Sequence, residues 1–447
     1  MKRKVSVGSD RALRPVLPKE RKQRSDHNNS DHNSGGGDEE GIEDVLVDKE
    51  LMFLIFGPDL FTWKDLPDAV LRQQLVAGNV VSFGLADPSG HGDHVDKLRP
   101  KCVEALARER VRDVSAGLYH SLVATKDGGL LSFGYGSANV VVDGRLGHGD
   151  QRTQMIPRPV LSLSGVRIVK VAAGAHHSLV LSDQGNVFSF GVGIDGSLGH
   201  GDQARQLVPK LISSLQREKV VDIAAGSAHS LVVAESGDVY SFGLGSEGAL
   251  GHGDTDMSLV PKKIEHFVQR PAVKVAAGGS HSLVLSKLYV LEQEGRVLSF
   301  GQNSYGQLGL GHFSRMIASP AQVQVEAAAV EIEAGAHHSL VLTNDGRVYS
   351  FGLAQHGQLG HGNDLRDNPE PTLIQSLERE RIVDVAAGNN FSLVLSAEGT
   401  VFSFGCGKNG RLGKGDESNA TQPTVVFAAG HTVSAISAGY SHSLVVV

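Results

Sequence analysis

The chain has 447 residues, a formal net charge of -7 at pH 7 and 55 glycines. Glycine is therefore about 12% of the chain against the usual ~7%, which together with 5% aromatic and 20% charged residues is typical of a folded, turn-rich protein and excludes bulk disorder and collagen. The longest apolar run, residues 51–56, is far shorter than the roughly 20 residues of a membrane helix. We therefore expect a non-membrane, non-secreted protein. Its two cysteines, Cys102 and Cys406, cannot build a disulfide framework, and we expect no redox chemistry.

The chain begins with a basic segment. Residues 1–24 hold nine Lys or Arg against Asp10 and Glu20, a balance of 9 - 2 = +7, and after a polar spacer residues 38–50 are acidic. Such segments bury no core, so we expect residues 1–50 to be a disordered tail. Two clusters of basic residues in this tail predict a nuclear import signal or an arm that binds nucleic-acid phosphates. A solvated tail without a partner is the alternative. Their residues are Lys2, Arg3, Lys4, Lys19, Arg21, Lys22 and Arg24.

Residues 51–77 fit neither this tail nor the pattern that follows. Their apolar start resembles a strand, and residues 63–75 read as a short helix. We expect an N-terminal extension that packs on the first blade of the domain described next.

Three signatures recur seven times each from residue 78 to the end of the chain. The first is Ser-Phe-Gly, with its glycine at 84, 134, 191, 243, 301, 352 and 405. The second is Leu-Gly-His-Gly-Asp or a variant, as in residues 146–150 and 198–202. The third is Ala-Gly-x-x-His-Ser-Leu or a variant, with its glycine at 117, 174, 226, 278, 335, 388 and 439, so the period is near 52 residues.

One repeat contains short strands joined by turns. Residues 177–182 and 186–191 predict a hairpin around Gly185, and residues 169–173 predict a further strand. Prolines at 157, 209, 261 and 369 are expected in the crossing loop or at a strand start. Three or four strands cannot bury both faces alone, so the repeats must stack. The sequence thus predicts an all-β, seven-bladed β-propeller over residues 78–447.

The ends of this region predict how the ring closes. The first Ser-Phe-Gly strand, residues 78–84, has no His-Ser-Leu strand before it, whereas residues 442–447 form such a strand with no Ser-Phe-Gly after it. We expect the C-terminal strand to pair with the first repeat strand, which removes both open edges.

The triple signature resembles the repeat of the regulator of chromosome condensation family, over more than four-fifths of the chain. The resemblance implies the propeller fold, and relatives of this kind include chromatin-bound exchange factors for the small GTPase Ran, propellers of large ubiquitin ligases and a plant ultraviolet-B photoreceptor. The photoreceptor branch senses light with a tryptophan cluster, whereas this chain has one tryptophan, Trp63. That branch is therefore excluded.

For the exchange factors, the resemblance implies two aspartates and a histidine inside the third signature. The matching positions here are Ala175, Ala228 and His337, and none of the seven triplets between the glycine and the His-Ser-Leu strand holds a carboxylate. His337 is the candidate GTPase-contact residue.

The 20 histidines do not predict catalysis or a metal site. Those of the third signature occur once per blade and cannot converge as zinc ligands, so we expect each to bond a neighbouring backbone group and lock its blade. Adjacent His and Ser point to opposite faces of a strand, and no P-loop is present. We expect no enzyme, no cofactor and no metal.

Two insertions predict partner-binding loops on one face of the ring, with neutral loop variation as the alternative. The first, residues 136–144, contains Val140, Val141 and Val142. The second, residues 287–293, contains Leu288, Tyr289 and Leu291.

These observations favour a non-enzymatic protein-interaction propeller, monomeric, located in the nucleus or the cytoplasm with the basic arm favouring the nucleus. The expected partner is a protein such as a Ran-like small GTPase, with nucleic acid or chromatin contacted through the arm and no membrane. A guanine-nucleotide exchange factor is the alternative. A substrate-recruiting propeller of a ubiquitin ligase is a weaker one, because these residues contain no ligase domain.

Overall fold

The computed structural model describes residues 78–137, 143–267, 270–287, 295–428 and 432–447. The chain divides into two units, 1–65 and 66–447, and every described residue lies in the second. The expectations for the basic clusters, for the acidic segment and for the extension at 51–77 fall outside the described residues.

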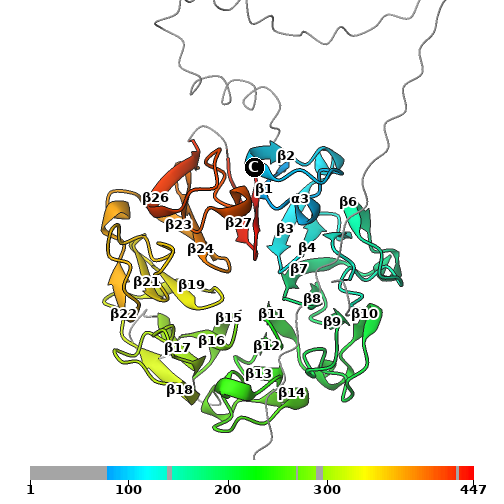
Figure 1. Ribbon diagram of the computed structural model, residues 1–447. Helices are drawn as coiled ribbons and strands as arrows, with labels where there is room; N and C mark the ends of the chain where they lie inside the picture. Colours follow the sequence, from blue (N-terminus) through cyan, green and yellow to red (C-terminus); the bar gives the residue numbers. More distant parts are fainter. Residues whose placement is uncertain (1–77, 138–142, 268–269, 288–294, 429–431) are drawn as a thin grey trace, which may run out of the picture. The chain divides into compact units, whose positions relative to one another are not determined.

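The described residues form seven four-stranded antiparallel sheets around a common axis, as the repeat count predicts (Figure 1). Blade 1 contains β1 (Val80–Gly84), β2 (Lys97–Cys102), β27 (Ala435–Ala438) and β28 (His442–Val446), with α3 (Ala86–Ser89) and η1 (Glu104–Leu106). Blade 2 contains β3 (Val111–Ala116), β4 (His120–Thr125), β5 (Leu130–Gly134), β6 (Gln154–Pro159) and η2 (Leu161–Leu163). Blade 3 contains β7 (Ile168–Ala173), β8 (His177–Ser182), β9 (Val187–Gly191), β10 (Gln206–Leu211) and η3 (Ser213–Leu215).

The other four blades repeat this order. Blade 4 contains β11 (Val220–Ala225), β12 (His229–Ala234), β13 (Val239–Gly243), β14 (Ser258–Lys263), η4 (Ser246–Gly248) and η5 (Glu265–Phe267). Blade 5 contains β15 (Ala272–Ala277), β16 (His281–Lys287), β17 (Gly295–Gln302) and β18 (Met316–Val323). Blade 6 contains β19 (Ala329–Ala334), β20 (His338–Thr343), β21 (Val348–Gly352), β22 (Asn368–Leu373) and η6 (Gln375–Leu377). Blade 7 contains β23 (Ile382–Ala387), β24 (Phe391–Ser396), β25 (Val401–Gly405), β26 (Ala420–Phe427) and η7 (Lys408–Gly410).

The predicted closure of the ring is confirmed. The C-terminal strand β28 lies between β1 and β27, and it pairs with β1 in antiparallel register from Val80↔Val446 to Gly84↔His442. Blade 1 is therefore built from both ends of the propeller, so closure depends on the last strand of the chain.

Hydrogen bonds among the three signatures hold the blades together. In blade 2, Ser132 of Ser-Phe-Gly donates from Oγ to the carbonyl of Leu146, 2.6 Å away, and His148 Nε2 bonds the same hydroxyl. The phenyl ring of each Ser-Phe-Gly is fully buried, and Phe190 lies against Gly147 of the preceding blade. The recurrence of the signatures is thus the recurrence of one set of contacts.

The third-signature histidines contact side chains, so the expectation that they bond backbone groups was wrong. His229 Nε2 lies 3.0 Å from Oγ of Ser282 in the next blade, and Ser282 itself donates to the carbonyl of Ala249. Since the serine has one proton and gives it to the carbonyl, the histidine must donate from Nε2. Six such links join successive blades: His120–Ser178, His177–Ser230, His229–Ser282, His281–Ser339, His338–Ser392 and His442–Ser121.

The link between blades 7 and 1 is of a different kind. Phe391 replaces the histidine there, and Ser443 retains only its bond to the carbonyl of Arg411. Phe391 instead joins an apolar cluster that contains residues of blades 6, 7 and 1, among them Val445. Burial of apolar area thus takes the place of a hydrogen bond between blades 7 and 1.

Prolines protect the outer edge of every blade. The expected crossing-loop position was wrong for Pro157, Pro209 and Pro261, because each lies inside the outer strand. All seven outer strands contain at least one proline. Proline lacks the backbone N–H that pairing would need, so these edges resist addition of a further strand.

The two faces of the ring are formed by different loops. We call the face with the Gly-x-x loops of the third signature the upper face, and the face with the hairpin turns, such as Lys126–Gly129, the lower face. No helix in the described part of the chain has the length and apolarity needed to span a membrane.

Candidate functional site: the upper face of the propeller

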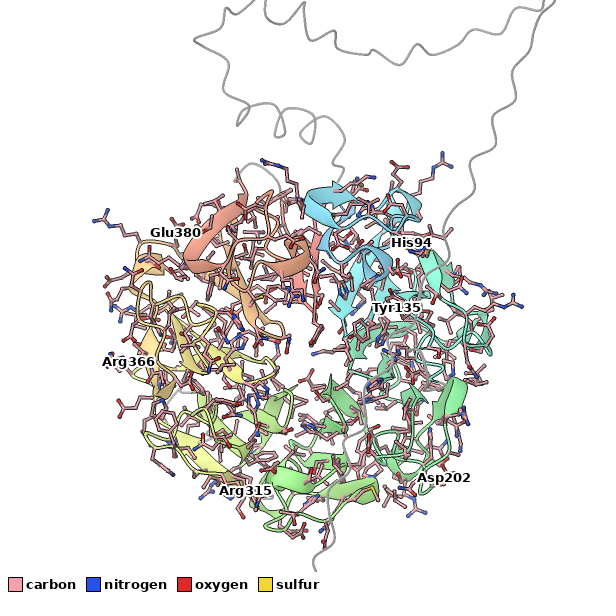
Figure 2. The ribbon with its side chains drawn as sticks, viewed as in Figure 1. His94, Tyr135, Asp202, Arg315, Arg366 and Glu380 are labelled. Atoms are coloured by element: carbon pink, nitrogen blue, oxygen red, sulfur yellow. The ribbon has the colours of Figure 1, made fainter. Side chains whose placement is uncertain are left out.

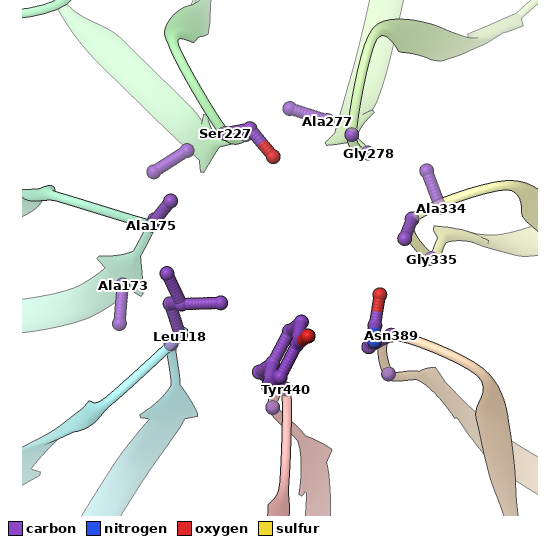
Figure 3. A pocket seen from close by; sticks show the side chains of 18 of the residues that line it. Leu118, Ala173, Ala175, Ser227, Ala277, Gly278, Ala334, Gly335, Asn389 and Tyr440 are labelled. Carbon is purple, nitrogen blue, oxygen red and sulfur yellow. The ribbon is translucent and has the colours of Figure 1, made fainter. Parts of the chain in front are cut away.

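A cavity of about 510 Å³ opens on the upper face at the axis, lined by the Gly-x-x loops of all seven blades. Short side chains such as Ala175, Ser227 and Asn389 surround most of the opening, whereas Leu118 and Tyr440 reach into it from one side (Figure 3). A ring of seven alanines borders this upper chamber and a second, lower chamber: Ala116, Ala173, Ala225, Ala277, Ala334, Ala387 and Ala438.

The structure brings together the three positions implied by the family resemblance. Ala175, Ala228 and His337 all line the upper chamber. His337 is half-buried, its ring lies 5.0 Å from the ring of Tyr305, and burial lowers the pKa of its imidazole. The imidazole is therefore neutral at physiological pH and is available as a hydrogen-bonding group.

A carboxylate that the triplet comparison missed lies in the same cavity. Asp195 follows β9 on a different loop, and it lines the upper chamber beside Ala175 and His176. Burial raises the pKa of Asp195, and the charge of His176 partly opposes that shift. Asp195 could have been found by aligning the residues that follow each Ser-Phe-Gly, because this position varies among otherwise constant neighbours: Glu247, Tyr305, His356 and Asn409 are its counterparts.

A buried ion pair fixes the loop that carries His176. Asp143 and Arg145 are fully buried and paired, and Arg145 also donates to the carbonyl of Ala175 at 3.0 Å. The Asp143 carboxylate lies 3.5 Å from His176 Nδ1. Removing either partner would leave an uncompensated buried charge, so this pair rigidifies the chamber wall.

A cluster of aromatic rings lies beside the chamber, where blades 7, 1 and 2 meet. Tyr119 contacts Tyr135 edge-on at 5.7 Å between ring centroids and Tyr440 at 5.8 Å. The guanidinium of Arg411 lies 5.9 Å from the centroid of the Tyr440 ring. Tyr440 is 37% exposed. A hydrogen bond with Asp87, with burial, raises the pKa of Tyr135 to about 12. Rings held in this way present a preformed surface.

Charged side chains occupy the periphery of the ring. Asp202, Arg315 and Arg366 lie at its outer edge, and Tyr135 lies nearer the axis (Figure 2). The upper face therefore combines an aromatic and small-residue centre with a charged rim, which is the usual anatomy of a protein interface.

The predicted partner loops lie mainly outside the described residues. The predicted loop residues that fall outside are Val140, Val141, Val142, Leu288, Tyr289 and Leu291. Of the described residues beside the insertions, 137 and 143 follow the upper end of β5, whereas 287 and 295 pair at the lower end of β16 and β17. The expectation that the two insertions form partner-binding loops therefore stays a prediction.

No group of three or more metal-binding side chains occurs within the described ranges. In the His–Ser links each serine hydroxyl already donates its proton to a backbone carbonyl, so the histidine does not take a proton from it. These links therefore have a structural role.

The chain is similar to known proteins over the propeller. The family described as the RCC1-like domain matches residues 79–445. The ultraviolet-B receptor UVR8 of Arabidopsis thaliana is 32% identical over 359 residues, which cover 79% of each chain. The human E3 ubiquitin-protein ligase HERC2 is 34% identical over 350 residues, 77% of this chain but 7% of the ligase.

Among solved structures, Prp20p of Saccharomyces cerevisiae superposes with a TM-score of 0.71 at 22% identity, covering 83% of this chain and 91% of Prp20p. That structure was described together with the binding of Prp20p to Gsp1p and histones. At this level of identity the likeness concerns the fold.

Proposed function

This chain belongs to the family of RCC1-like domains, and from that premise we propose that it is a non-enzymatic interaction propeller that binds a protein partner across its upper face. The observation that carries the proposal is the cluster of Tyr119, Tyr135, Tyr440 and Arg411 beside the upper chamber. Tyrosine and arginine are the side chains most enriched where protein interfaces gain their binding energy.

The surroundings of the cluster support the same use. Ile194, on the loop that also carries Asp195, is 63% exposed, and Leu244 of the next blade is also exposed. Apolar side chains that remain exposed beside a polar, partly buried cavity are suited to burial under a partner. The cavity has room for one inserted side chain from that partner.

The experiment measures binding of the full chain to two purified probes, a Ran-like GTPase and a dimer of core histones, by surface plasmon resonance. These probes are chosen because the structural neighbour Prp20p was studied with Gsp1p and histones. We expect Tyr440→Ala to weaken binding of the partner about tenfold or more. Leu161→Ala, at an exposed lower-face residue, is the matched control and should bind as the wild type does. Equal binding by Tyr440→Ala would contradict the upper-face assignment.

Exchange-factor activity is a second candidate, favoured by Asp195. Nucleotide release requires groups that compete for the phosphate and magnesium site, and Asp195, His176 and His337 line one chamber although Ala175 and Ala228 replace the expected aspartates. Release of a fluorescent nucleotide from the GTPase tests it, with catalytic amounts of the chain. Acceleration that Asp195→Asn abolishes would support exchange. Acceleration that survives both Asp195→Asn and His337→Ala would exclude this chamber.

We also propose that the basic arm directs the chain to the nucleus. The support is the sequence pattern alone, two clusters of Lys and Arg within residues 1–24. Replacement of Lys19, Arg21, Lys22 and Arg24 by alanine in a fluorescent fusion should shift the protein to the cytoplasm. An unchanged distribution would remove the arm from consideration.

A further inference from the structure

The lower chamber differs from the upper one in being lined by charge. It has a volume of about 290 Å³ and lies below the alanine ring. Blades 2 to 7 each have an ionisable side chain three residues before the alanine of the inner strand. These residues are Asp113, Lys170, Asp222, Lys274, Glu331 and Asp384. Asp113, Lys170, Lys274 and Asp384 line the chamber, and Glu333 of blade 6 lines it as well.

The two lysines are already paired with carboxylates. Lys170 contacts Asp222 of the next blade, and Lys274 contacts Glu331 in the same way. Three carboxylates therefore remain without a cation: Asp113, Glu333 and Asp384. The chamber therefore holds more carboxyl groups than cationic side chains.

Those three carboxylates differ in their hydrogen bonds. Asp113 accepts from the backbone N–H of Val171 at 2.9 Å, and Asp384 accepts from that of Ile436 at 3.3 Å. Among the described residues, the side chain of Glu333 makes no hydrogen bond and no ion pair within 4.0 Å, although Lys274 is near enough to lower its pKa. A carboxyl on the wall of an enclosed chamber with no partner is a position that a ligand would complete.

The protonation of these groups reflects the crowding of negative charge. Burial raises the pKa of Glu333 to about 8, and burial with the neighbouring Glu331 raises that of Asp384 to about 7. Burial also raises the pKa of Asp113. The chamber therefore retains protons near neutral pH, and a cation placed inside would displace them.

The side chains just below the chamber are mixed, because three blades carry an exposed valine there and blade 2 carries the exposed Arg112. Val221, Val330 and Val383 lie at the lower ends of their inner strands, each one residue before an acidic residue, and they are 43%, 48% and 48% exposed. Exposed valines at the rim and carboxylates inside match a side chain with an aliphatic stem and a cationic head.

We propose that the lower chamber receives the side chain of a lysine or arginine from a partner protein, with its aliphatic stem against Val221, Val330 and Val383 and its cationic head beside Glu333. The volume corresponds to about ten waters, so one extended side chain fits and a folded element does not. The site lies on the face opposite Tyr440. The proposal is therefore tested independently of the one for the upper face.

The test uses the full chain and a fluorescein-labelled hexalysine peptide, with the same peptide acetylated on every ε-amino group as the neutral probe. Fluorescence anisotropy should show saturable binding of hexalysine and about tenfold weaker binding by Glu333→Gln. Glu398→Gln, on an exposed turn of the lower face, makes the same charge change outside the chamber and should bind within about twofold of the wild type. Circular dichroism of both variants establishes that each is folded.

A pH series supplies a second readout. The lysine head stays protonated between pH 6.5 and 8, whereas Glu333 and Asp384 lose protons in this range. The affinity of the wild type for hexalysine should therefore rise about tenfold, and that of Glu333→Gln should rise less. Equal binding by Glu333→Gln and Glu398→Gln, equal binding of the acetylated peptide, or absence of saturable binding would overturn the proposal.

Discussion

Acidification should destabilise this propeller through its buried His–Ser links. In the unfolded chain a histidine has a pKa of about 6.5. In the fold, burial lowers that pKa to about 3 for His177, His281, His338 and His442, and to about 4 for His229. Nε2 already donates to serine, and in the four with pKa about 3 the buried Nδ1 has no hydrogen-bond partner within the described structure, so a second proton has no acceptor there.

The sign follows from proton linkage. A group whose pKa is lowered by folding contributes stability that is present above pH 6.5 and is lost as the pH falls below it, because the unfolded chain then binds more protons. At pH 5.0 each of the five residues lowers the free energy of unfolding by about 2 kcal/mol, a sum of about 10 kcal/mol.

Two carboxyls act in the opposite sense. The raised pKa values of Glu333 and Asp384 mean that these groups cost stability at neutral pH and recover it as they protonate. Between pH 7.5 and 5.0 they return about 5 kcal/mol together. These seven groups together give a net loss of about 5 kcal/mol, to which His120 adds because burial also lowers its pKa well below the ordinary value. The total stability of a typical domain is about 5–15 kcal/mol.

Urea unfolding followed by far-ultraviolet circular dichroism at pH 7.5, 6.5, 5.5 and 5.0 measures this loss at constant ionic strength. In His281→Gln the amide can still donate to Ser339 but does not titrate, so the loss should shrink by about 2 kcal/mol. His94→Gln, at an exposed side chain, should leave it unchanged. A stability at pH 5.0 within about 1 kcal/mol of that at pH 7.5 would refute the reasoning, as would an unaltered loss in His281→Gln.

Three further perturbations probe the contacts between blades, each measured by urea or thermal unfolding. Ser282→Ala should cost about 1–3 kcal/mol because it leaves His229 and a buried carbonyl unpaired, whereas Ser443→Ala should cost less because its histidine is absent; equal costs would contradict the link. Deletion of residues 440–447 removes β28 from between β1 and β27 and should lower the melting temperature of the whole ring, and an unchanged value would argue against closure through this strand. Gly278→Ala would place a methyl group against the backbone oxygen of Gly335 in the next blade, so the free energy of unfolding should fall by about 1–3 kcal/mol or more. An unfolding curve of the variant that matches the wild type would disprove this.

The contacts between repeats explain why the sequence predicted the fold so fully. A spacing near 52 residues with three recurring signatures fixes the size and number of the blades, because most signature residues have equivalent partners from blade to blade. Ser132, for example, donates a hydrogen bond to the second signature of its own blade, at Leu146, and Phe190 packs on the preceding blade. The unmatched strands at the two ends likewise predicted the pairing of β1 with β28.

The partners of individual side chains were less predictable. The histidines bond serines of the neighbouring blade, as His229 bonds Ser282, and no local pattern distinguishes that partner from a backbone group. The position of the prolines on outer edges also depends on which strand each segment becomes.

The repeat pattern was enough to predict the architecture: seven all-β blades, their closure, and the placement of Ala175, Ala228 and His337 in the Gly-x-x loops around one axis. The tertiary structure alone decided which groups meet at that axis. Asp195 joins the upper chamber and Glu333 the lower one because side chains from different blades, tens to hundreds of residues apart, converge only when the ring is closed. A repeat encodes what every blade shares, whereas function rests on the positions at which the blades differ, and the electrostatics of those positions depend on their neighbours across the channel.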